Sequence, residues 1–493
     1  MSHQPSWSMR AHFAVVFMAS WMASAPLLGQ RSPTAVSETK VGPARGTVIV
    51  VGGGFMAPDL YARFIQEAGG PDALIVDVPT ATGDTGITQD WAGARAWRLM
   101  GAHNVYVLHT TDRRIADSDS MVAILKRAGG VWFEGGRHYR LVDAYAGTRT
   151  EQAFRDVLAR GGVIGGSSAG ATILGDFLVR GAPSNDNSIM DYPGYEKGFG
   201  YLRGVAIDQH VIARERLRDL ADSIIPKHPT LLGLSADEGT AWIVRGDTGT
   251  IVGPSKAFVY ASRQSNDSGK PFVTLFPGDR FDLAKRRVTH RAAADSPVSE
   301  ALVDSLMGQY AGAGATVLVA QHGDVFIDKS YGIAPQPKYM PTTTVPQFAI
   351  DNIADLFTGF CAQLPIPRER CLPTVLPAIG MHKSAQAAPI GSMSSVDELY
   401  RWSQMVPVWR LLVNPTPESE AFKRSFNEDR GWQADTYRGT ARYRAFGLPD
   451  GKRNVFVRLP DLGATIIVLT NIDSADAASI ADRITNRLLL KKN

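Results

Sequence analysis

The chain has 493 residues, of which 44% are hydrophobic and 20% are charged. These fractions are ordinary for a soluble globular protein, and the length corresponds to roughly two to four domains, which excludes a single small module. The 52 Lys and Arg residues nearly balance the 48 Asp and Glu residues, leaving a net charge of +4. Because the charges form no long basic run, nucleic acid is not expected as a partner.

Residues 1–30 have the pattern of a secretory signal peptide. Arg10 is the only Lys or Arg in this stretch, an apolar run follows it, and the small residues Ala23 and Ala25 offer a cleavage site. The alternative is an uncleaved membrane anchor, but the run contains Ser and Pro and is barely long enough to span a bilayer. We therefore expect export to the periplasm or secretion, a linker over residues 31–45, and no membrane span after cleavage.

The next part of the chain alternates between apolar strand-like segments and amphipathic helix-like ones. Apolar runs that end in glycine-rich or polar turns predict buried parallel strands within residues 47–54, 73–82, 104–110, 129–136 and 161–168. The patterns between them predict helices, for example over residues 117–128 and 148–160. Strands that alternate with helices indicate a three-layer α/β sandwich with a mostly parallel sheet.

The last of these strand-like segments contains Gly166-Ser167-Ser168-Ala169-Gly170, a G-x-S-x-G pattern between an apolar strand and an apolar helix start. The pattern is typical of a nucleophile elbow, whose tight turn needs small residues on both sides of the serine. In this interpretation Ser168 is a nucleophile and the backbone N–H of Ala169 is an oxyanion donor. The alternative is a phosphate-binding turn or a helix N-terminus that Ser168 only caps.

A serine nucleophile needs a base within hydrogen-bonding distance and a group that orients the base. His210 ends the apolar segment GVAIDQH, and open α/β sheets assemble their sites at the carboxyl ends of strands. Downstream, Asp237 and Glu238 follow another short apolar run, so one of the two carboxylates could reach the same edge. The order Ser, His, acid differs from that of α/β-hydrolases, which argues against that fold.

Several motifs from residue 46 to residue 261 resemble the cyanophycinase and aspartyl dipeptidase family of serine peptidases, whose fold is similar to that of class I glutamine amidotransferases. They are VIVVGGG, VPTAT, VWFEGG, GGVIGGSSAGA, DQH and GLSADEGTA. The resemblance implies that Ser168 is the nucleophile, His210 the general base and Glu238 the acid that orients it. It also implies Gly136 as a second oxyanion donor.

The same resemblance implies a set of substrate-binding residues. Asp208 and Gln209 belong to the DQH motif, and Arg214 and Arg216 match the first two arginines of the stretch that follows it. His138 stands where the family carries a glutamine, so one substrate-contacting position departs from the pattern. Arginines near the nucleophile would favour a substrate carboxylate, although the charge alternation of RERLRD is also typical of a solvated helix face. The expected substrate is an acidic or isoaspartyl peptide, and cyanophycin itself stays undecided.

The predicted elements change after residue 290. A helix over residues 299–310 precedes two strands joined by a tight turn at residues 322–324, and the chain closes with two further strands and a helix over residues 477–490. We place a domain boundary at residues 288–298. It separates a peptidase domain over residues 46–290 from a smaller domain over residues 296–493.

The smaller domain resembles, more weakly, the α+β fold of serine β-lactamases and penicillin-binding proteins. Where that family carries serine and lysine three residues apart, this chain has Asn352 and Asp355. Neither can act as the alkoxide nucleophile or as the lysine base. The resemblance therefore implies a shortened, catalytically inactive domain that serves in substrate capture, oligomerisation or stability.

The two cysteines, Cys361 and Cys371, lie in a proline-rich stretch. In an oxidising compartment they could close a small loop. Without clustered histidines or carboxylates they lack the ligand count and spacing of a zinc site. We predict neither a metal nor a cofactor.

Three hypotheses follow from these observations. The first is an exported serine peptidase that hydrolyses peptide bonds next to aspartyl residues through an acyl-enzyme. The second is an amidase or other hydrolase that uses the same residues on a non-peptide substrate, and the third is a non-catalytic binding protein. The expected partner is a peptide or small-molecule substrate of acidic character, and a homodimer is left open.

Overall fold

The computed structural model describes residues 40–84, 86–184, 187–189, 192–262, 270–310, 314–332, 346–362, 364, 366–413 and 431–490. Glu38–Asn493 forms one compact unit. The predicted signal peptide and the first part of the predicted linker lie outside the described residues. The domain boundary at residues 288–298 stays a prediction.

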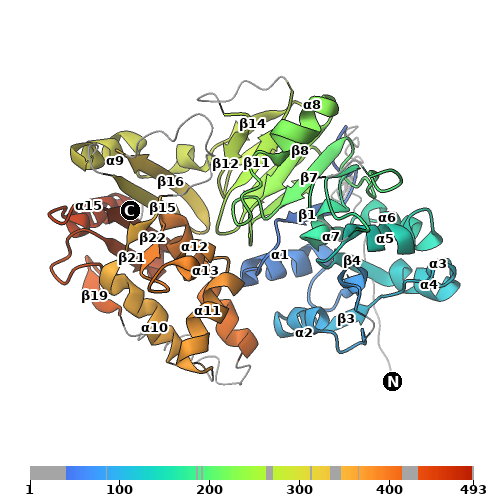
Figure 1. Cartoon of the computed structure of the whole chain (residues 1–493), viewed down its shortest axis with the longest axis horizontal. Helices are drawn as coiled ribbons and strands as arrows, with labels where there is room; N and C mark the ends of the chain where they lie inside the picture. The colour runs from blue at the N-terminus through green and yellow to red at the C-terminus, as the bar shows by residue number, and fades with distance from the viewer. Residues whose placement is uncertain are drawn as a thin grey trace, which may run out of the picture. The chain divides into compact units, whose positions relative to one another are not determined.

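Among the described residues, nine strands form the first sheet, in the order β14-β13-β10-β9-β1-β5-β4-β2-β3. Figure 1 labels β1, β3, β4 and β14 of this sheet. Strands β1 to β5 arise from the predicted apolar runs and pair in parallel. The bounds are β1 Thr47–Val51, β2 Leu74–Val78, β3 Asn104–Val107, β4 Ala128–Phe133, β5 Val163–Ser167, β9 Ala241–Arg245, β10 Thr248–Val252, β13 Arg280–Asp282 and β14 Arg287–His290.

Strands β9, β10, β13 and β14 extend this sheet in antiparallel pairs, so the sheet is mixed rather than mostly parallel. For β9 and β10 the reason is the length of their connection. Arg245 pairs with Thr248 across a turn of two residues, Gly246 and Asp247, and strands joined by so short a turn can pair only in the antiparallel sense.

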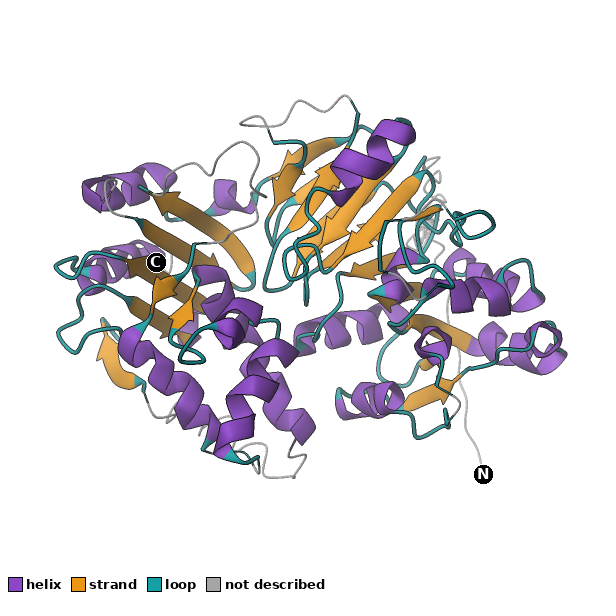
Figure 2. Ribbon diagram, in the orientation of Figure 1, coloured by secondary structure: helices purple, strands orange, loops and turns teal. Residues whose placement is uncertain are grey.

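Helices cover both faces of the parallel strands (Figure 2). Because side chains alternate along a strand, Val48 and Val50 of β1 pack with α4, α5 and α6, while Ile49 and Val51 pack with α1 and α2. The three-layer α/β sandwich is therefore confirmed. The helix bounds are α1 Pro58–Ala68, α2 Ala92–Leu99, α3 Arg113–Ala116, α4 Asp119–Arg127, α5 His138–Tyr145, α6 Arg149–Ala159 and α7 Ala169–Thr172.

A second sheet in the described part of the chain has the order β12-β11-β8-β7-β6. Its bounds are β6 Phe177–Leu178, β7 Val205–Gln209, β8 Leu232–Ala236, β11 Ala257–Tyr260 and β12 Val273–Leu275, with the short helix α8, Ile225–Lys227, between β7 and β8. Strands β7 and β8 are parallel neighbours. The residues that follow them, His210 and the pair Asp237 and Glu238, therefore reach the same edge of the sheet.

The described part of residues 296–493, which we call the C-terminal third, is built on an antiparallel sheet in the order β16-β15-β22-β21-β20-β19, with a separate pair of β17 and β18. The strand bounds are β15 Ala315–Gln321, β16 Asp324–Tyr331, β17 Phe348–Ala349, β18 Met393–Ser394, β19 Gln433–Tyr437, β20 Thr440–Phe446, β21 Val455–Leu459 and β22 Ala464–Thr470. The predicted strand pair around residues 322–324 is thus β15 and β16.

Helices also cover both faces of this sheet. Val317 and Val319 pack with α9 and α15, whereas Leu318 and Ala320 pack with α10, α11 and α13. This arrangement fits the predicted α+β second domain. The helix bounds are α9 Glu300–Met307, α10 Asp355–Cys361, α11 Arg368–Ala378, α12 His382–Gln386, α13 Val396–Val413 and α15 Ala477–Leu490.

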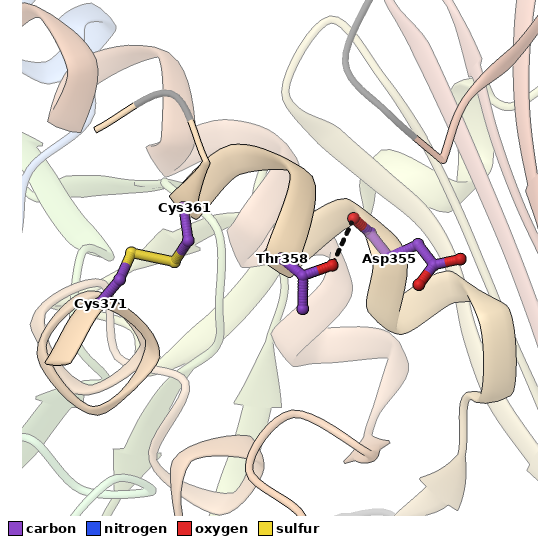
Figure 3. The surroundings of a disulfide bond; sticks show 4 residues. All are labelled: Asp355, Thr358, Cys361 and Cys371. Carbon is purple, nitrogen blue, oxygen red and sulfur yellow. Dashed lines mark hydrogen bonds between the residues drawn. A yellow bond between two sulfur atoms is a disulfide. The ribbon is translucent and has the colours of Figure 1, made fainter. Parts of the chain in front are cut away.

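Cys361 at the end of α10 and Cys371 in α11 form a disulfide with their Cα atoms 5.8 Å apart, which closes the small loop (Figure 3). Asp355 begins α10, and its carbonyl oxygen accepts a hydrogen bond from Thr358 Oγ1 at 3.2 Å. Within the ranges given above, no helix combines the length and the apolarity needed to cross a bilayer.

Candidate active site

The G-x-S-x-G segment forms a sharp turn between a strand and a helix. Strand β5 ends at Ser167 and α7 begins at Ala169, so Ser168 occupies the turn itself. Its φ of 57° and ψ of −117° are unusual for a residue with a side chain and indicate local strain. A Cβ atom on Gly166 would lie 2.1 Å from the carbonyl oxygen of Gly170. The turn therefore requires glycine at position 166, as a nucleophile elbow does.

Ser168, His210 and Glu238 form a continuous hydrogen-bonded row. Nε2 of His210 lies 2.9 Å from Ser168 Oγ, and Nδ1 lies 2.5 Å from Glu238 Oε1. An ionised carboxylate only accepts hydrogen bonds, so Nδ1 carries the imidazole proton and Nε2 accepts the hydroxyl hydrogen. His210 is 4% exposed and Glu238 is 5% exposed, which keeps this row out of bulk water.

The environment of Glu238 keeps the carboxylate ionised. Burial alone would raise its pKa, but the hydrogen bonds from His210 and His382 outweigh burial and hold the pKa well below its ordinary value. An ionised Glu238 can stabilise the positive charge that His210 acquires when it takes a proton.

The glycine turn at residues 52–54, directly after β1, joins the loops that carry His210 and Glu238. The carbonyl oxygen of Gly52 accepts a hydrogen bond from the backbone N–H of His210 at 2.8 Å. The carbonyl oxygen of Gly53 accepts one from Gly239 at 2.8 Å. The backbone of this turn therefore fixes the distance between the two loops.

Two of these glycines also make room for side chains. A Cβ atom on Gly53 would lie 2.2 Å from Cε1 and Nε2 of His210, and one on Gly54 would lie 2.7 Å from Cβ of Glu238. These glycines were not among the predicted site residues. The signal that could have found them is the run of three glycines at the carboxyl end of a buried strand.

The turn after β4 also adjoins the serine. A Cβ atom on Gly135 would lie 3.8 Å from Ser168 Oγ, whereas one on Gly136 would lie 2.1 Å from the carbonyl oxygen of Ala81. Gly136 has a φ of 138°, a value that L residues rarely adopt. At the other side of Ser168, Ala169 is the first residue of α7, so its N–H has no carbonyl within the helix to bond to. Both turns can present backbone N–H groups to an oxyanion.

Asp208 is paired inside the protein. Nε and Nη2 of Arg180 donate to its two carboxylate oxygens at 3.0 Å and 2.7 Å, and Nη2 also donates to Asp219 at 2.7 Å. Asp208 is 1% exposed and Arg180 is 4% exposed. The bidentate contact compensates the buried charge of Asp208. Arg180 was missed in the sequence because it follows a strand of two residues and belongs to no motif.

The predicted arginines differ in their surroundings. Arg216 is 8% exposed, and its Nη1 donates to Gln209 Oε1 at 3.4 Å. Burial, and then the nearby Arg180, lower the pKa of Arg216 to about 10, so it stays charged at neutral pH. Arg214 is exposed. The structure therefore brings Gln209 and Arg216 together beside Arg180 and leaves Arg214 at the surface.

His138 is the first residue of α5 and is 1% exposed. A Cβ atom on Gly181 would lie 2.7 Å from its Nδ1, so the imidazole packs against the backbone next to Arg180. Burial, and then Arg137, lower the pKa of His138 to about 3. The side chain is therefore neutral, and it belongs to the surroundings of Arg180.

Two side chains from the C-terminal third reach the acidic turn after β8. Nε2 of His382 lies 2.9 Å from Glu238 Oε2. Arg401 donates from Nη2 to Asp237 Oδ2 at 2.7 Å and from Nη1 to the carbonyl oxygen of Glu238. His382 and Glu238 are 144 positions apart in the chain, and Arg401 and Asp237 are 164 positions apart. No local pattern in the sequence could have revealed them.

This arrangement can carry out acyl transfer. A hydroxyl on a strained turn faces a neutral imidazole nitrogen that can accept its proton, and the buried carboxylate holds the imidazole in the matching tautomer. Glycine-rich backbone lies on both sides of the hydroxyl. Within the described residues, no group of three or more His, Cys, Asp or Glu side chains could hold a metal ion.

Comparison with known proteins gives a match over the same part of the chain. Residues 48–252 match the sequence model described as Peptidase family S51. A cyanophycinase of Synechococcus elongatus is 29% identical over 270 residues, covering 50% of this chain and 82% of the relative. A cyanophycinase of a Nostoc species is 28% identical over 265 residues, covering 49% of this chain and 87% of the relative.

Solved structures give weaker likenesses. A peptidase from an acI-B1 actinobacterium has a TM-score of 0.37 and 22% identity, covering 48% of this chain and 97% of that one. An octameric penicillin-binding protein homologue from Pyrococcus abyssi has a TM-score of 0.31 and 12% identity, covering 39% of this chain and 77% of that one.

Proposed function

We propose, from the match of residues 48–252 to the model of peptidase family S51, that the protein is an exported serine peptidase that hydrolyses peptide bonds next to aspartyl residues. The enzyme is a serine-type hydrolase. The observation that carries the finer proposal is the buried row of Ser168, His210 and Glu238, with contacts of 2.9 Å and 2.5 Å.

In the proposed reaction, Ser168 Oγ attacks the carbonyl carbon of the scissile bond while Nε2 of His210 takes the hydroxyl proton. The negative charge on the carbonyl oxygen is stabilised by the backbone N–H groups of Ala169 and Gly136. His210 then gives its proton to the departing amine, which leaves an ester on Ser168. A water molecule, deprotonated by His210, attacks the ester carbonyl carbon. His210 then returns that proton to Ser168 Oγ as the bond between the acyl group and Ser168 breaks, which releases the second product. Glu238 stays ionised throughout and stabilises the transient imidazolium.

The proposed substrate is an acidic or isoaspartyl peptide. The cyanophycinase relatives support this class. Arg216 supports it independently, because a buried guanidinium that donates to Gln209 at 3.4 Å can offer its other N–H groups to a carboxylate. Asp208 is paired with Arg180, so in this proposal it orients Arg180 and does not itself bind a substrate cation.

Export is part of the proposal. The pattern of residues 1–30 suggests a signal peptide, and the disulfide between Cys361 and Cys371 supports an oxidising compartment. The compartment can be checked by expressing the full chain with its native N-terminus, fractionating the cells and sequencing the N-terminus of the purified protein. Retention of residue 1 in the cytoplasmic fraction would contradict export.

The function is tested by incubating the purified protein with α-aspartyl dipeptides, β-aspartyl dipeptides and cyanophycin, and measuring the free amine released. Ser168→Ala is the control, and its thermal unfolding is compared with that of the unmodified protein. We expect release from at least one aspartyl substrate that is lost in Ser168→Ala. Turnover of non-peptide amides alone would favour the amidase hypothesis, and ligand binding that is equal in both proteins without turnover would favour a binding protein.

A further inference from the structure

We infer that the C-terminal third takes part in catalysis through His382, which positions the carboxylate of Glu238. This inference rests on the proposed function, because it assumes that Ser168, His210 and Glu238 perform the reaction. His382 acts through Glu238 and does not touch the reacting atoms, so it is a positioning residue.

The two oxygens of Glu238 are held from opposite regions of the chain. Oε1 accepts the hydrogen bond from His210 at 2.5 Å, and Oε2 accepts one from His382 at 2.9 Å. The terminal torsion of a glutamate is soft, so a single hydrogen bond leaves the plane of the carboxylate free to turn. A second donor on the other oxygen fixes that plane and, through it, the orientation of the His210 ring.

His382 is itself firmly held. It is the first residue of α12, and the Glu398 side chain from α13 accepts hydrogen bonds from the backbone N–H groups of Lys383 and Ser384 and from Ser384 Oγ at 2.7 Å. These are N–H groups that the first turn of a helix leaves unsatisfied. Glu398 therefore anchors the end of α12 that carries His382.

Two further contacts join the C-terminal third to the residues at the end of β8. A Cβ atom on Gly380 would lie 3.0 Å from Glu238 Oε2, so the turn before α12 lies directly against the carboxylate. Arg401, 4% exposed, donates to the Glu238 carbonyl oxygen and to Asp237. The C-terminal third thus contacts Glu238 at its side chain and at its backbone.

The role of the C-terminal third in positioning Glu238 could not be inferred from the sequence of that region. The positions where β-lactamases carry their serine and lysine hold Asn352 and Asp355, yet α12 and α13 of the same region complete the surroundings of the acid. In this inference the region contributes to the reaction through α12 and α13, which contact the carboxylate and the backbone of Glu238.

The test compares three variants at one helix end. His382→Ala removes the donor, His382→Gln replaces Nε2–H with an amide N–H at a similar reach, and Lys383→Ala is the matched control. Lys383 is the next residue of α12 and forms an exposed pair with Glu215 at 2.9 Å. Each variant is assayed for kcat and KM on the best aspartyl substrate, and for the rate at which a fluorophosphonate labels Ser168 with loss of fluoride.

We expect His382→Ala to lower kcat and the labelling rate by about 10- to 100-fold, the effect of losing one hydrogen bond to a charged group. KM should change by less than about 3-fold, because the missing contact does not touch the substrate. His382→Gln should recover most of the loss, and Lys383→Ala should behave as the unmodified protein. The labelling assay needs no knowledge of the true substrate.

Two outcomes would overturn the inference. One is a His382→Ala protein with unchanged kcat and labelling rate. The other is a loss of kcat in His382→Ala that is equally large in His382→Gln, although the His382→Gln protein unfolds at the same temperature as Lys383→Ala. Failure of the proposed function looks different, because the unmodified protein would then match Ser168→Ala in both assays.

Discussion

Lys256 Nζ lies 2.7 Å from Asp328 and 3.1 Å from Asp397, so one cation from residues 46–290 is held between two carboxylates of the C-terminal third. The side chains of all three residues are at most 17% exposed. Burial alone would lower the pKa of Lys256, but the two carboxylates outweigh it and raise the pKa. The ammonium group therefore stays charged.

Replacing Lys256 with methionine should destabilise the whole unit. Two buried carboxylates would lose their shared cation, and breaking a buried ion pair costs about 3 to 5 kcal/mol. Urea unfolding measures the loss. Lys329→Met is the matched control, since Lys329 also contacts two carboxylates, Glu300 and Asp304, but at the surface, where such pairs contribute about 0 to 1 kcal/mol. Equal losses in the two variants would contradict the structural importance of Lys256.

Gly53→Ala should abolish most of the activity. The new Cβ atom would lie 2.2 Å from the His210 ring and displace the ring from Ser168, and a misplacement of about 1 Å can cost 100-fold in rate. Gly70→Ala is the control, because Gly70 has a similar φ of 103° against 100° for Gly53, and a Cβ there meets nothing within 4 Å. Both variants carry the backbone strain, so a lower kcat shared by both would refute the explanation by displacement.

Asp77→Asn should stabilise the protein at neutral pH. Asp77 at the end of β2 and Glu134 after β4 both lie against Gly93 of α2. Burial, and then the Glu134 carboxylate, raise the pKa of Asp77 well above its ordinary value. The unfolded chain therefore ionises at a lower pH than the folded one, and between the two pKa values the protein loses about 1.4 kcal/mol per pH unit as the pH rises.

The asparagine variant lacks this penalty. Its stability should equal that of the unmodified protein below about pH 3.9, the ordinary pKa of aspartate, and should exceed it at pH 7. Unfolding by urea at several pH values gives the difference. A variant that is less stable than the unmodified protein at every pH would show that the carboxyl group of Asp77 is needed for another contact.

Removing the disulfide should lower stability without removing the fold. The loop between Cys361 and Cys371 spans ten positions, and closing a loop of this length contributes about 2 to 3 kcal/mol in the chain-entropy description. The melting temperature should fall when a reductant is added. In the variant with serine at both positions the melting temperature should be lower from the start and insensitive to the reductant. A reductant effect in that variant would point to a different cause.

The parts of the fold that follow from local pattern were predictable. The strands β1 to β5 were found because full burial leaves continuous apolar runs in the chain, and the closing helix α15 was found from its own local pattern. The same reading missed the mixed sense of the first sheet. Buried parallel and antiparallel strands look alike in composition, and the sense of β9 and β10 depends on a turn of two residues.

Some residues of the candidate site could be predicted from local motifs and others could not. Ser168, His210 and Glu238 lie in motifs at strand ends, so their proximity could be expected, and the structure has them in one hydrogen-bonded row. Arg180 and His382 could not be found, because each meets its partner through tertiary packing. The resemblance implied only Gly136 as the second oxyanion donor, whereas in the structure it is Gly135 whose added Cβ atom would lie 3.8 Å from Ser168 Oγ.

The contact between His382 and Glu238 also has a consequence in time. The ribosome adds His382 144 residues after Glu238, which at about 5 to 20 residues per second is a delay of roughly 7 to 30 s. During that interval the emerging chain already contains Ser168, His210 and Glu238, but the acid has not received its second donor. In the proposed arrangement, a chain that ends before α12 contains Ser168, His210 and Glu238 but lacks the second donor to the Glu238 carboxylate.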